Sequence, residues 1–461
     1  MATITKRNDT YRITVSAGYD CTGKQIRRSM TWKPAPSMTK KQIEKEVNRQ
    51  ALLFEEKVKN GVYLDGSIRF SEFADKWFND YAEKQLRATT LERYKSMLPR
   101  TNAAIGHLHL EKIQPHHLIA FYNNLAEEGI RKDTKYTSAI DLKETIRAKG
   151  FTFASLAEAA HIGERTVSTA AKGNNVSEKT AVAISEALCI PLKELFTSAE
   201  ENKTLSSATV HHYHGFISSI LSTAVQWQVI FSNPCDRVKP PKVQKPEPKY
   251  LDEEQAKQML EYLAEESPQF SAMIQVLMFT GMRRGELLGL EWSDIDLDNA
   301  VIQINRSSLY LPEKGVFEDE TKTSGSQRAI KAPQSVIEVL REHRVWQNKQ
   351  RLQMGDKWIN SNRLFTSWNG QPLNPTALTS QFRQFKLKHN LTDITIHGLR
   401  HTNATLQIAN GVPLTTVANR LGHANSATTA RIYAHAIRSA DEAAAEVLED
   451  LLSPNKNRKT S

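Results

Sequence analysis

The sequence predicts a multidomain, mainly helical protein that begins with a small β-sheet and ends with a mixed α+β domain. Its 461 residues are enough for two to four domains of ~100–200 residues each. Apolar residues make up 39% and charged residues 24% of the chain, which supports ordinary cores and argues against a disordered or fibrous protein. Apolar residues recur at every second position near the start of the chain and at helical spacing after it. A proline-rich segment separates the C-terminal part of the chain from the rest.

The first 65 residues predict a three-stranded sheet packed on one helix. Apolar and polar residues alternate in Tyr11–Ser16 and in Lys24–Trp32, and the turn Asp20–Gly23 separates these runs. Apolar residues then recur at helical spacing from Lys40 to Lys59. This region holds 13 basic and 7 acidic side chains, which is +6 of the net +10 of the chain. Basic side chains on one face of the sheet would suit a polyanion; a solvated basic face without a partner is the alternative.

A helical domain with an insertion follows. Helical periods run from Phe70 to Leu125 and return from Thr209 to Val229, so both stretches are expected to form one bundle. Residues 137–200 interrupt it with a pattern of four or five short helices, with turns at Gly150 and Gly163. We interpret this segment as an inserted module.

The segment Lys239–Lys249 contains four prolines and four lysines, which disfavour a helix and predict a basic, extended linker. Beyond it, helices mix with a strand at Ala300–Asn305 and a hairpin that leads to Arg328–Ile330. The tail from Pro454 is polar and is expected to be disordered. The expected parts are 1–65, 66–235 interrupted by 137–200, 236–249, 250–453 and 454–461.

Four motifs in the last domain occur in a fixed order. They are Thr280–Glu286, Thr321–Arg328 at a strand turn, His397–His401 opening a helix, and Leu421–His423 with Tyr433 ten residues later. Each alone is a weak signal. Together, their order of Arg, Lys, His-x-x-Arg, Leu-Gly-His and Tyr resembles the tyrosine recombinase family of phage and transposon integrases. The resemblance covers nearly everything outside the insertion, and it implies an arm-type DNA-binding domain, a helical core-binding domain and a catalytic domain.

The chemistry of phosphodiester cleavage accounts for the two arginines. Nucleophilic attack concentrates negative charge on the non-bridging oxygens, and two guanidinium groups can clamp these oxygens while remaining charged. Arg283 and Arg400 fit that role, and such positioned charge is usually the largest catalytic contribution. Glu286, three residues after Arg283, is expected to fix the neighbouring side chains.

The resemblance implies that Tyr433 attacks the phosphorus and forms a 3′-phosphotyrosine. A phenol with a pKa of ~10 needs a proton acceptor or strong electrostatic help, and His397 is the expected base or orienting group. Lys322 is the candidate general acid for the departing 5′-oxygen. His423 would donate a further hydrogen bond to the phosphate. The covalent link preserves the energy of the phosphodiester, so no cofactor and no metal is expected.

Other basic residues are interpreted as contacts rather than catalysts. Arg284 is expected to face solvent or the DNA backbone, and His401 to cap its helix or contact DNA rather than bind zinc. Arg328 cannot give up a proton as a general acid, so a surface or phosphate contact is expected. Further candidate DNA-binding residues are Arg12, Lys24, Arg27, Arg28, Lys239 and Lys242.

The inserted module resembles a repressor-like helix-turn-helix, with Gly150–Ala160 as the first helix of the pair and Glu164–Ala171 as the recognition helix. Residues 137–200 carry 7 basic and 8 acidic side chains, fewer cations than sequence-specific readers usually present. Direct DNA reading and a protein-contact or spacer role both remain open. The helical pattern Ile437–Leu452 could pack on its own domain; in related recombinases such a helix docks onto a neighbouring subunit.

These observations predict a site-specific DNA recombinase that integrates and excises a mobile element such as a prophage or transposon. Its partners would be double-stranded DNA at arm-type and core sites and three further copies in a synaptic tetramer, with an excision factor or host DNA-bending protein as candidate accessories. With three scattered cysteines, no long apolar run and no secretory signal, a cytoplasmic location is expected. The alternatives are a helix-turn-helix regulator with an inactive recombinase domain, and a topoisomerase-like relaxing enzyme.

Overall fold

The computed structural model describes residues 2–19, 23, 25–59, 68–128, 135–198, 204–243, 247–320, 327–391, 394–423 and 425–433. It divides into two compact units, Met1–Gln244 and Lys245–Ser461. The predicted fold class is confirmed, because the chain is mainly helical with small antiparallel sheets. Within the described residues, no helix is both long enough and apolar enough to cross a membrane.

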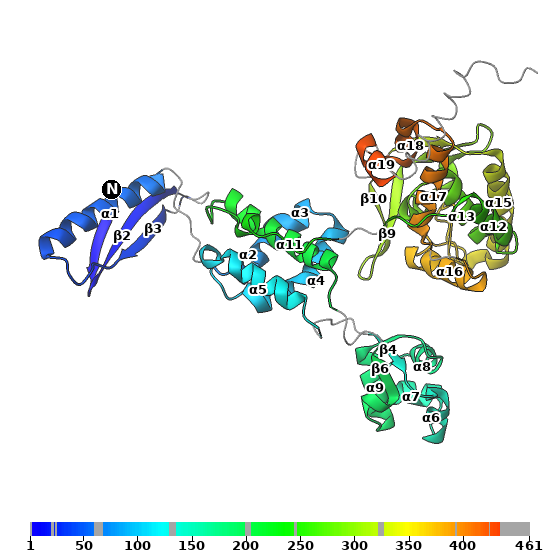
Figure 1. The fold of residues 1–461 in the computed structure, drawn as a ribbon, viewed down its shortest axis with the longest axis horizontal. Coiled ribbons are helices and arrows are strands. Elements are labelled where there is room, and N and C mark those ends of the chain that lie inside the picture. The colour runs from blue at the N-terminus through cyan, green and yellow to red at the C-terminus, as the bar shows by residue number, and fades with distance from the viewer. Residues whose placement is uncertain are drawn as a thin grey trace, which may run out of the picture. The chain divides into compact units, whose positions relative to one another are not determined.

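The N-terminal end forms the expected sheet on one helix (Figure 1). The strands β1 (Thr3–Arg7), β2 (Thr10–Tyr19) and β3 (Gln25–Trp32) pair antiparallel in chain order, and α1 (Lys40–Lys59) covers one face. Ile13 and Val15 of β2 are buried against α1, because alternate residues of a strand point to the same face.

The helical bundle is built from two separated stretches of sequence. Its helices are α2 (Phe70–Trp77), the π-helix Phe78–Ala82, α3 (Glu83–Gln85), α4 (Ala88–Ile105), α5 (Pro115–Leu125) and α11 (Ser207–Gln226). One buried core joins them, and the Trp77 Nε1–H donates to Thr223 Oγ1 at 2.9 Å across the interruption. Short 3₁₀ turns at Leu110–Lys112 and Pro234–Arg237 complete this part.

The insertion has a core of its own. Its helices are α6 (Leu142–Ala148), α7 (Phe153–Ala159), α8 (Glu164–Ala171), α9 (Glu178–Leu188) and α10 (Leu192–Leu195). The strand β4 (Lys135–Ser138) pairs antiparallel with both β5 (Val176–Ser177) and β6 (Phe196–Ser198), so the chain enters and leaves the module at adjacent points. The short helices agree with the sequence prediction, which missed the three strands.

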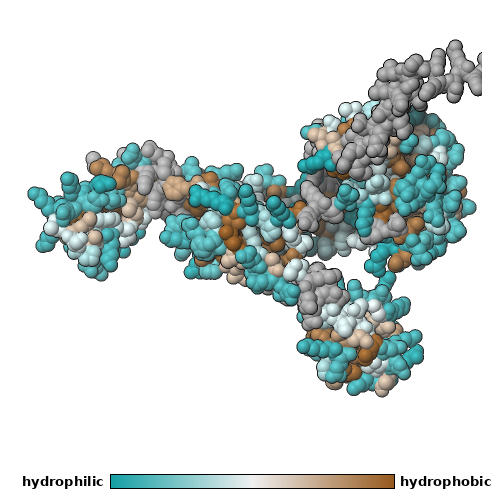
Figure 2. Space-filling model, viewed as in Figure 1, coloured by the Kyte–Doolittle hydropathy of each residue, from teal (hydrophilic) through white to brown (hydrophobic). Residues whose placement is uncertain are grey.

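The C-terminal unit consists of helices and two small antiparallel sheets. Its helices are α12 (Glu253–Leu263), α13 (Pro268–Thr280), α14 (Arg284–Gly289), α15 (Gln334–Met354), α16 (Pro375–Lys388), α17 (Ile396–Ala409), α18 (Leu414–Leu421) and α19 (Ser426–Ile432). Its sheets are β11–β8–β7 (Arg328–Lys331, Val301–Ile304, Ile295–Asp296) and the hairpin of β9 (Arg306–Leu311) and β10 (Gly315–Glu320). Helix α13 is buried over most of its length and packs on α15 and α17. Figure 2 shows hydrophilic side chains over most of the visible face of this unit.

Candidate active site

Arg283 lies at the turn between α13 and α14. Gly281 directly follows the last residue of α13 and has φ +66°. A Cβ at this position would lie 2.6 Å from Asn403 Oδ1, so only glycine fits there. Arg283 then caps α14: its backbone N–H donates to Glu286 Oε2 at 2.9 Å and its Nη1 donates to Glu286 Oε1 at 2.7 Å. Because the Arg283 side chain is 44% exposed, the guanidinium is held in place and still reaches solvent.

Arg400 lies on α17 and is buried, with 3% of its surface exposed. Its Nη1 donates to the Gly281 carbonyl and its Nη2 to the Leu421 carbonyl, both at 2.8 Å. One guanidinium therefore joins the turn that carries Arg283 to the segment that carries His423. Burial and the charge of Arg283 lower the pKa of Arg400 to about 10, so this side chain remains a cation at neutral pH.

Glu286 and Arg328 form a buried ion pair behind these arginines. Arg328 Nη2 lies 2.9 Å from Glu286 Oε2, and Arg328 Nε donates to the Arg420 carbonyl at 2.6 Å. Burial raises the pKa of Glu286, but the hydrogen bond and charge of Arg328, together with Arg283, outweigh it and lower that pKa. The expected surface position of Arg328 is wrong: its side chain is only 7% exposed because Glu286 neutralises it inside the domain.

The Leu-Gly-His segment ends α18. Gly422 has φ +67°, and a Cβ there would lie 2.7 Å from Arg328 Nη1, so glycine lets the arginine pass beneath the turn. His423 Nδ1 is 2.7 Å from Thr429 Oγ1. Burial and then the charges of Arg400 and Arg283 lower the pKa of His423 to about 4, so its imidazole is neutral at pH 7. With Nδ1 engaged by Thr429, Nε2 is the nitrogen left to face a phosphate.

Tyr433 directly follows α19 and is 1% exposed. Its ring packs in an apolar cluster with Ala404, Ile408, Val417 and Leu421, side chains of α17 and α18. Burial raises the pKa of Tyr433 to about 12, and the charge of Arg400 opposes that shift. Tyr433 shares its cluster with Leu421, whose carbonyl accepts a hydrogen bond from Arg400 Nη2, so the tyrosine and the buried arginine belong to one site.

Two histidines of α17, His397 and His401, lie near Tyr433. The Tyr433 hydroxyl is 3.0 Å from His401 Nδ1, and the ring of His397 lies edge-on to the ring of His401 with centroids 4.7 Å apart. Burial, Arg400 and Arg283 lower the pKa of His397. The expected helix-capping role of His401 is wrong, since Thr395 Oγ1 caps α17 by accepting the Gly398 N–H. No local pattern in the sequence signals the contact of His401 with Tyr433, which joins residues 32 positions apart.

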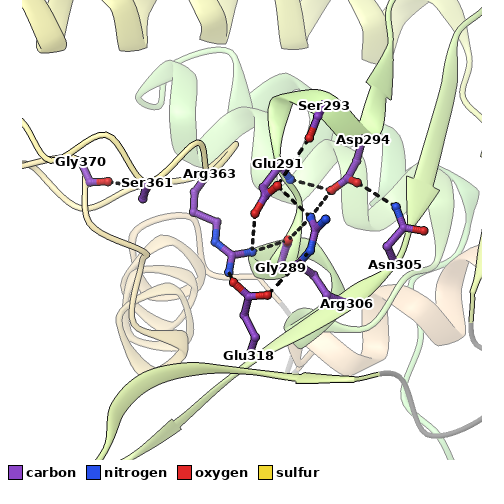
Figure 3. Close-up of polar contacts among 10 residues, drawn as sticks. All are labelled: Gly289, Glu291, Ser293, Asp294, Asn305, Arg306, Glu318, Ser361, Arg363 and Gly370. Carbon is purple, nitrogen blue, oxygen red and sulfur yellow. Dashed lines mark hydrogen bonds and ion pairs between the residues drawn. The ribbon is translucent and has the colours of Figure 1, made fainter.

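Lys322 lies outside the described residues, but the hairpin that precedes it is described. A cluster of charged side chains anchors this hairpin to the domain (Figure 3). Glu318 of β10 forms an ion pair with Arg363, which also donates to the Gly289 carbonyl. Arg306 of β9 binds Asp294 Oδ2 at 2.5 Å and lies 3.9 Å from Glu318 Oε2.

The candidate DNA-binding residues are spread over both units. Arg12 and Arg27 are exposed and lie on the face of the N-terminal sheet that points away from α1, where Arg12 Nη2 donates to Ser29 Oγ at 3.1 Å. Arg28 pairs with the buried Val15 and so lies on the opposite face, which corrects the expectation of a single basic face. Lys24 lies outside the described residues. Three further candidates, Lys239, Lys242 and Arg284, are also exposed. Arg284 Nη1 donates to Thr379 Oγ1 at 2.6 Å.

The described residues contain no group of three or more His, Cys, Asp or Glu side chains placed to hold a metal ion. What the arrangement offers instead is fixed positive charge around a buried phenol. Two guanidinium groups, a neutral imidazole and a tyrosine hydroxyl share the region where α14, α17, α18 and α19 meet. Such a set can stabilise an anionic, five-coordinate phosphorus centre while the phenol attacks it.

Comparisons with known proteins agree with this chemistry. The phage integrase family matches residues 249–439, and the SAM-like N-terminal domain of phage integrases matches residues 69–126. A XerC-like tyrosine recombinase of Caldanaerobacter subterraneus is 31% identical over 263 residues, which cover 53% of this chain and 67% of that protein. The ICEBs1 integrase of Bacillus subtilis is 27% identical over 248 residues, 54% of this chain and 67% of that protein.

Among solved structures, an integrase of the Tn1549 transposon in complex with a circular-intermediate DNA has a similar fold. It superposes with a TM-score of 0.55 at 17% identity and covers 83% of this chain and 100% of that chain. The matched family region 249–439 contains all the candidate catalytic positions from Arg283 to Tyr433.

Proposed function

We propose that Tyr433 is the nucleophile of this protein and that Arg283 and Arg400 hold the phosphate under attack. The chain belongs to the phage integrase family of tyrosine recombinases, which are site-specific enzymes that cut and rejoin DNA. The observation that carries this proposal is the bonding of Arg400 to both Gly281 and Leu421. That bonding ties the Arg283 turn and the His423 segment to the helix on which Tyr433 packs.

The arginines act through charge that is already in position. Arg283 keeps an exposed guanidinium edge while Glu286 fixes its other side, so it can meet a phosphate without reorganising. Arg400 remains cationic although it is buried, and its field favours the phenolate of Tyr433 as well as the phosphate oxygens. His423 donates a further hydrogen bond to the phosphate from Nε2, since Nδ1 contacts Thr429.

In the cleavage step the Tyr433 oxygen forms a bond to phosphorus as its proton leaves. The bond from phosphorus to the 5′-oxygen breaks, and Lys322 supplies the proton that this oxygen takes up. A second strand with a free 5′-hydroxyl reverses the step and releases Tyr433. Cleavage and religation together keep the number of phosphate ester bonds constant. When both steps occur on the two strands of two DNA sites, they integrate or excise a mobile element.

The remaining parts are proposed to hold DNA. We infer that residues 66–235 and 250–453 bind core sites and that residues 1–65 bind arm-type sites, with Arg12 and Arg27 on the outward face of the sheet. The inserted module either reads DNA through α8 or serves as a protein contact or a spacer. Thr137 and Thr197 pair on neighbouring strands, so deleting residues 137–200 should leave cleavage of a core site intact if the module is accessory.

Assembly into a tetramer is supported by a cavity in the C-terminal unit. It has a volume of about 610 Å³ and is lined by Leu260, Met278, Phe279 and Leu406 of α12, α13 and α17, together with charged and polar side chains of the same unit. The segment 437–452, which lies outside the described residues, carries apolar residues at helical spacing that could fill this cavity on a neighbouring copy. Leu406→Asp should then block synapsis while cleavage of a single core site persists.

We further propose that the enzyme is cytoplasmic and that an excision factor or a host DNA-bending protein directs its reaction.

Covalent trapping tests the proposed function. A core site with a nick near the scissile phosphate loses its short product by diffusion, so the cleaved complex accumulates. The wild-type protein should form an adduct that resists denaturing electrophoresis, and Tyr433→Phe should bind the same DNA without forming it. An adduct formed equally by both proteins would contradict the assignment of the nucleophile.

A further inference from the structure

The hydroxyl of the proposed nucleophile has a partner that the sequence did not indicate. His401 Nδ1 lies 3.0 Å from the Tyr433 oxygen, a distance within the reach of a general base. Resting on the proposed role of Tyr433, we propose that His401 is a catalytic residue that takes the phenolic proton during cleavage and returns it during religation.

The surroundings of Tyr433 make a proton acceptor necessary. The side chain is 1% exposed and lies among Ala404, Ile408, Val417 and Leu421, so water has little access to its ring. Burial raises the pKa of this phenol to about 12 even with the opposing charge of Arg400, so at pH 7 roughly one molecule in 10⁵ would carry the phenolate. Arg400 stabilises the phenolate by its charge but cannot accept a proton, because a guanidinium has no free lone pair to offer.

The geometry favours His401 over its neighbour His397. Both lie on α17, but His401 is the one within hydrogen-bond distance of the phenol, whereas the ring of His397 meets the His401 ring at an interplanar angle of 84°. His401 is thus contacted by His397 from α17 and by Tyr433, which directly follows α19, and Arg400 precedes it in the chain. For the phenol to donate, His401 must carry its own proton on Nε2 and present a lone pair at Nδ1.

The step balances with groups already named. The phenolic proton moves to His401 Nδ1 while an electron pair of the Tyr433 oxygen forms the bond to phosphorus. The 5′-oxygen leaves with the electron pair of the broken P–O bond and takes a proton from Lys322. At religation the incoming 5′-hydroxyl returns its proton to Lys322, and the imidazolium of His401 protonates the departing phenolate.

The test is a single-turnover cleavage rate with saturating enzyme on a nicked core site. His401→Ala should slow cleavage by about 10²–10⁴-fold, the range for loss of a general base, and should leave the dissociation constant for the same DNA unchanged. Asn410→Ala, at the exposed end of the same helix, is the matched control and should cleave as the wild type does.

A second variant and a pH profile separate proton transfer from positioning. His401→Gln keeps a hydrogen-bond acceptor beside the phenol but cannot be protonated, so it should remain slow. The rates of both variants should climb tenfold per pH unit well into the alkaline range, where the wild-type rate has levelled off, because they depend on phenolate formed without a base.

Three results would overturn the proposal. They are a wild-type rate in His401→Ala, full recovery in His401→Gln, and an effect confined to DNA affinity, which would restore a DNA-contact role. These results differ from failure of the proposed function, in which the wild-type protein itself forms no adduct or Tyr433→Phe still forms one.

Discussion

Replacing Glu286 by glutamine tests whether one buried carboxylate organises the arginines of the site. This carboxylate is 3% exposed and receives Arg283 Nη1 at 2.7 Å, the Arg283 N–H at 2.9 Å and Arg328 Nη2 at 2.9 Å. Breaking a buried pair by removing one charge costs about 3–5 kcal/mol. Most of that cost falls on the contact with Arg328, which is 7% exposed, because Arg283 is 44% exposed and its pair is screened by solvent.

The Glu286→Gln variant should therefore be about 3–5 kcal/mol less stable than the wild type at pH 7 in urea unfolding followed by circular dichroism. It should also cleave about 10²-fold more slowly, since a shift of about 1 Å in a positioned catalytic group costs that much. The conservative change Glu261→Gln, at an exposed position of α12, is the control and should alter stability by less than about 0.5 kcal/mol.

The pH dependence of this difference has a defined sign. The pKa of Glu286 is lowered in the folded protein, so its contribution to stability is complete above the ordinary pKa of 4.5 and is lost as the pH falls through the lower folded value. The stability gap between wild type and Glu286→Gln should consequently shrink on acidification below about pH 4.5. A variant with wild-type stability and wild-type cleavage would refute the argument that the carboxylate holds the two arginines.

Three further predictions concern the backbone and charge around the site. Gly422→Ala should destabilise the protein by about 1–3 kcal/mol in the same urea assay, because its φ of +67° disfavours a side chain and the new Cβ would crowd Arg328; an unchanged unfolding midpoint would contradict this. Arg400→Lys should reduce the single-turnover rate by about 10²–10³-fold with little change in DNA affinity, since one ammonium cannot replace the guanidinium bonds to two carbonyls; an effect on affinity alone would argue against a phosphate clamp. Arg363→Gln should loosen the hairpin at Glu318, which leads to Lys322. It should slow cleavage of an ordinary DNA site more than cleavage of a site with a 5′-sulfur leaving group, because a sulfur leaving group needs no general acid. Equal slowing of both substrates would show that the contact of Arg363 with Glu318 does not support protonation of the leaving group.

The motifs predicted a shared site for Arg283, Arg400 and His423, and the structure links the three segments that carry them through the hydrogen bonds of Arg400. Arg283 and His423 follow the ends of α13 and α18, where Gly281 and Gly422 adopt the left-handed conformation, and Arg400 is buried on α17, whose first turn Thr395 caps. These glycines and this cap are local signals, so a single sequence carries them.

Contacts that join distant segments were not predictable in the same way. The bond between His401 and Tyr433 spans 32 residues and depends on how α17, α18 and α19 pack, which no local pattern encodes. Arg328 was expected to make a surface or phosphate contact, and only the position of Glu286 in space explains its burial. The two- and three-residue strands β5 and β6 are too short to show an alternating pattern.

The central claim is that the oxygen of Tyr433 becomes bonded to DNA. Protease digestion of the trapped complex, followed by mass spectrometry of the peptide that retains a nucleotide, locates that bond directly. The account predicts a 3′-phosphorylated nucleotide on the peptide that contains Tyr433. A nucleotide attached to any other residue, or joined through a 5′-phosphate, would contradict it.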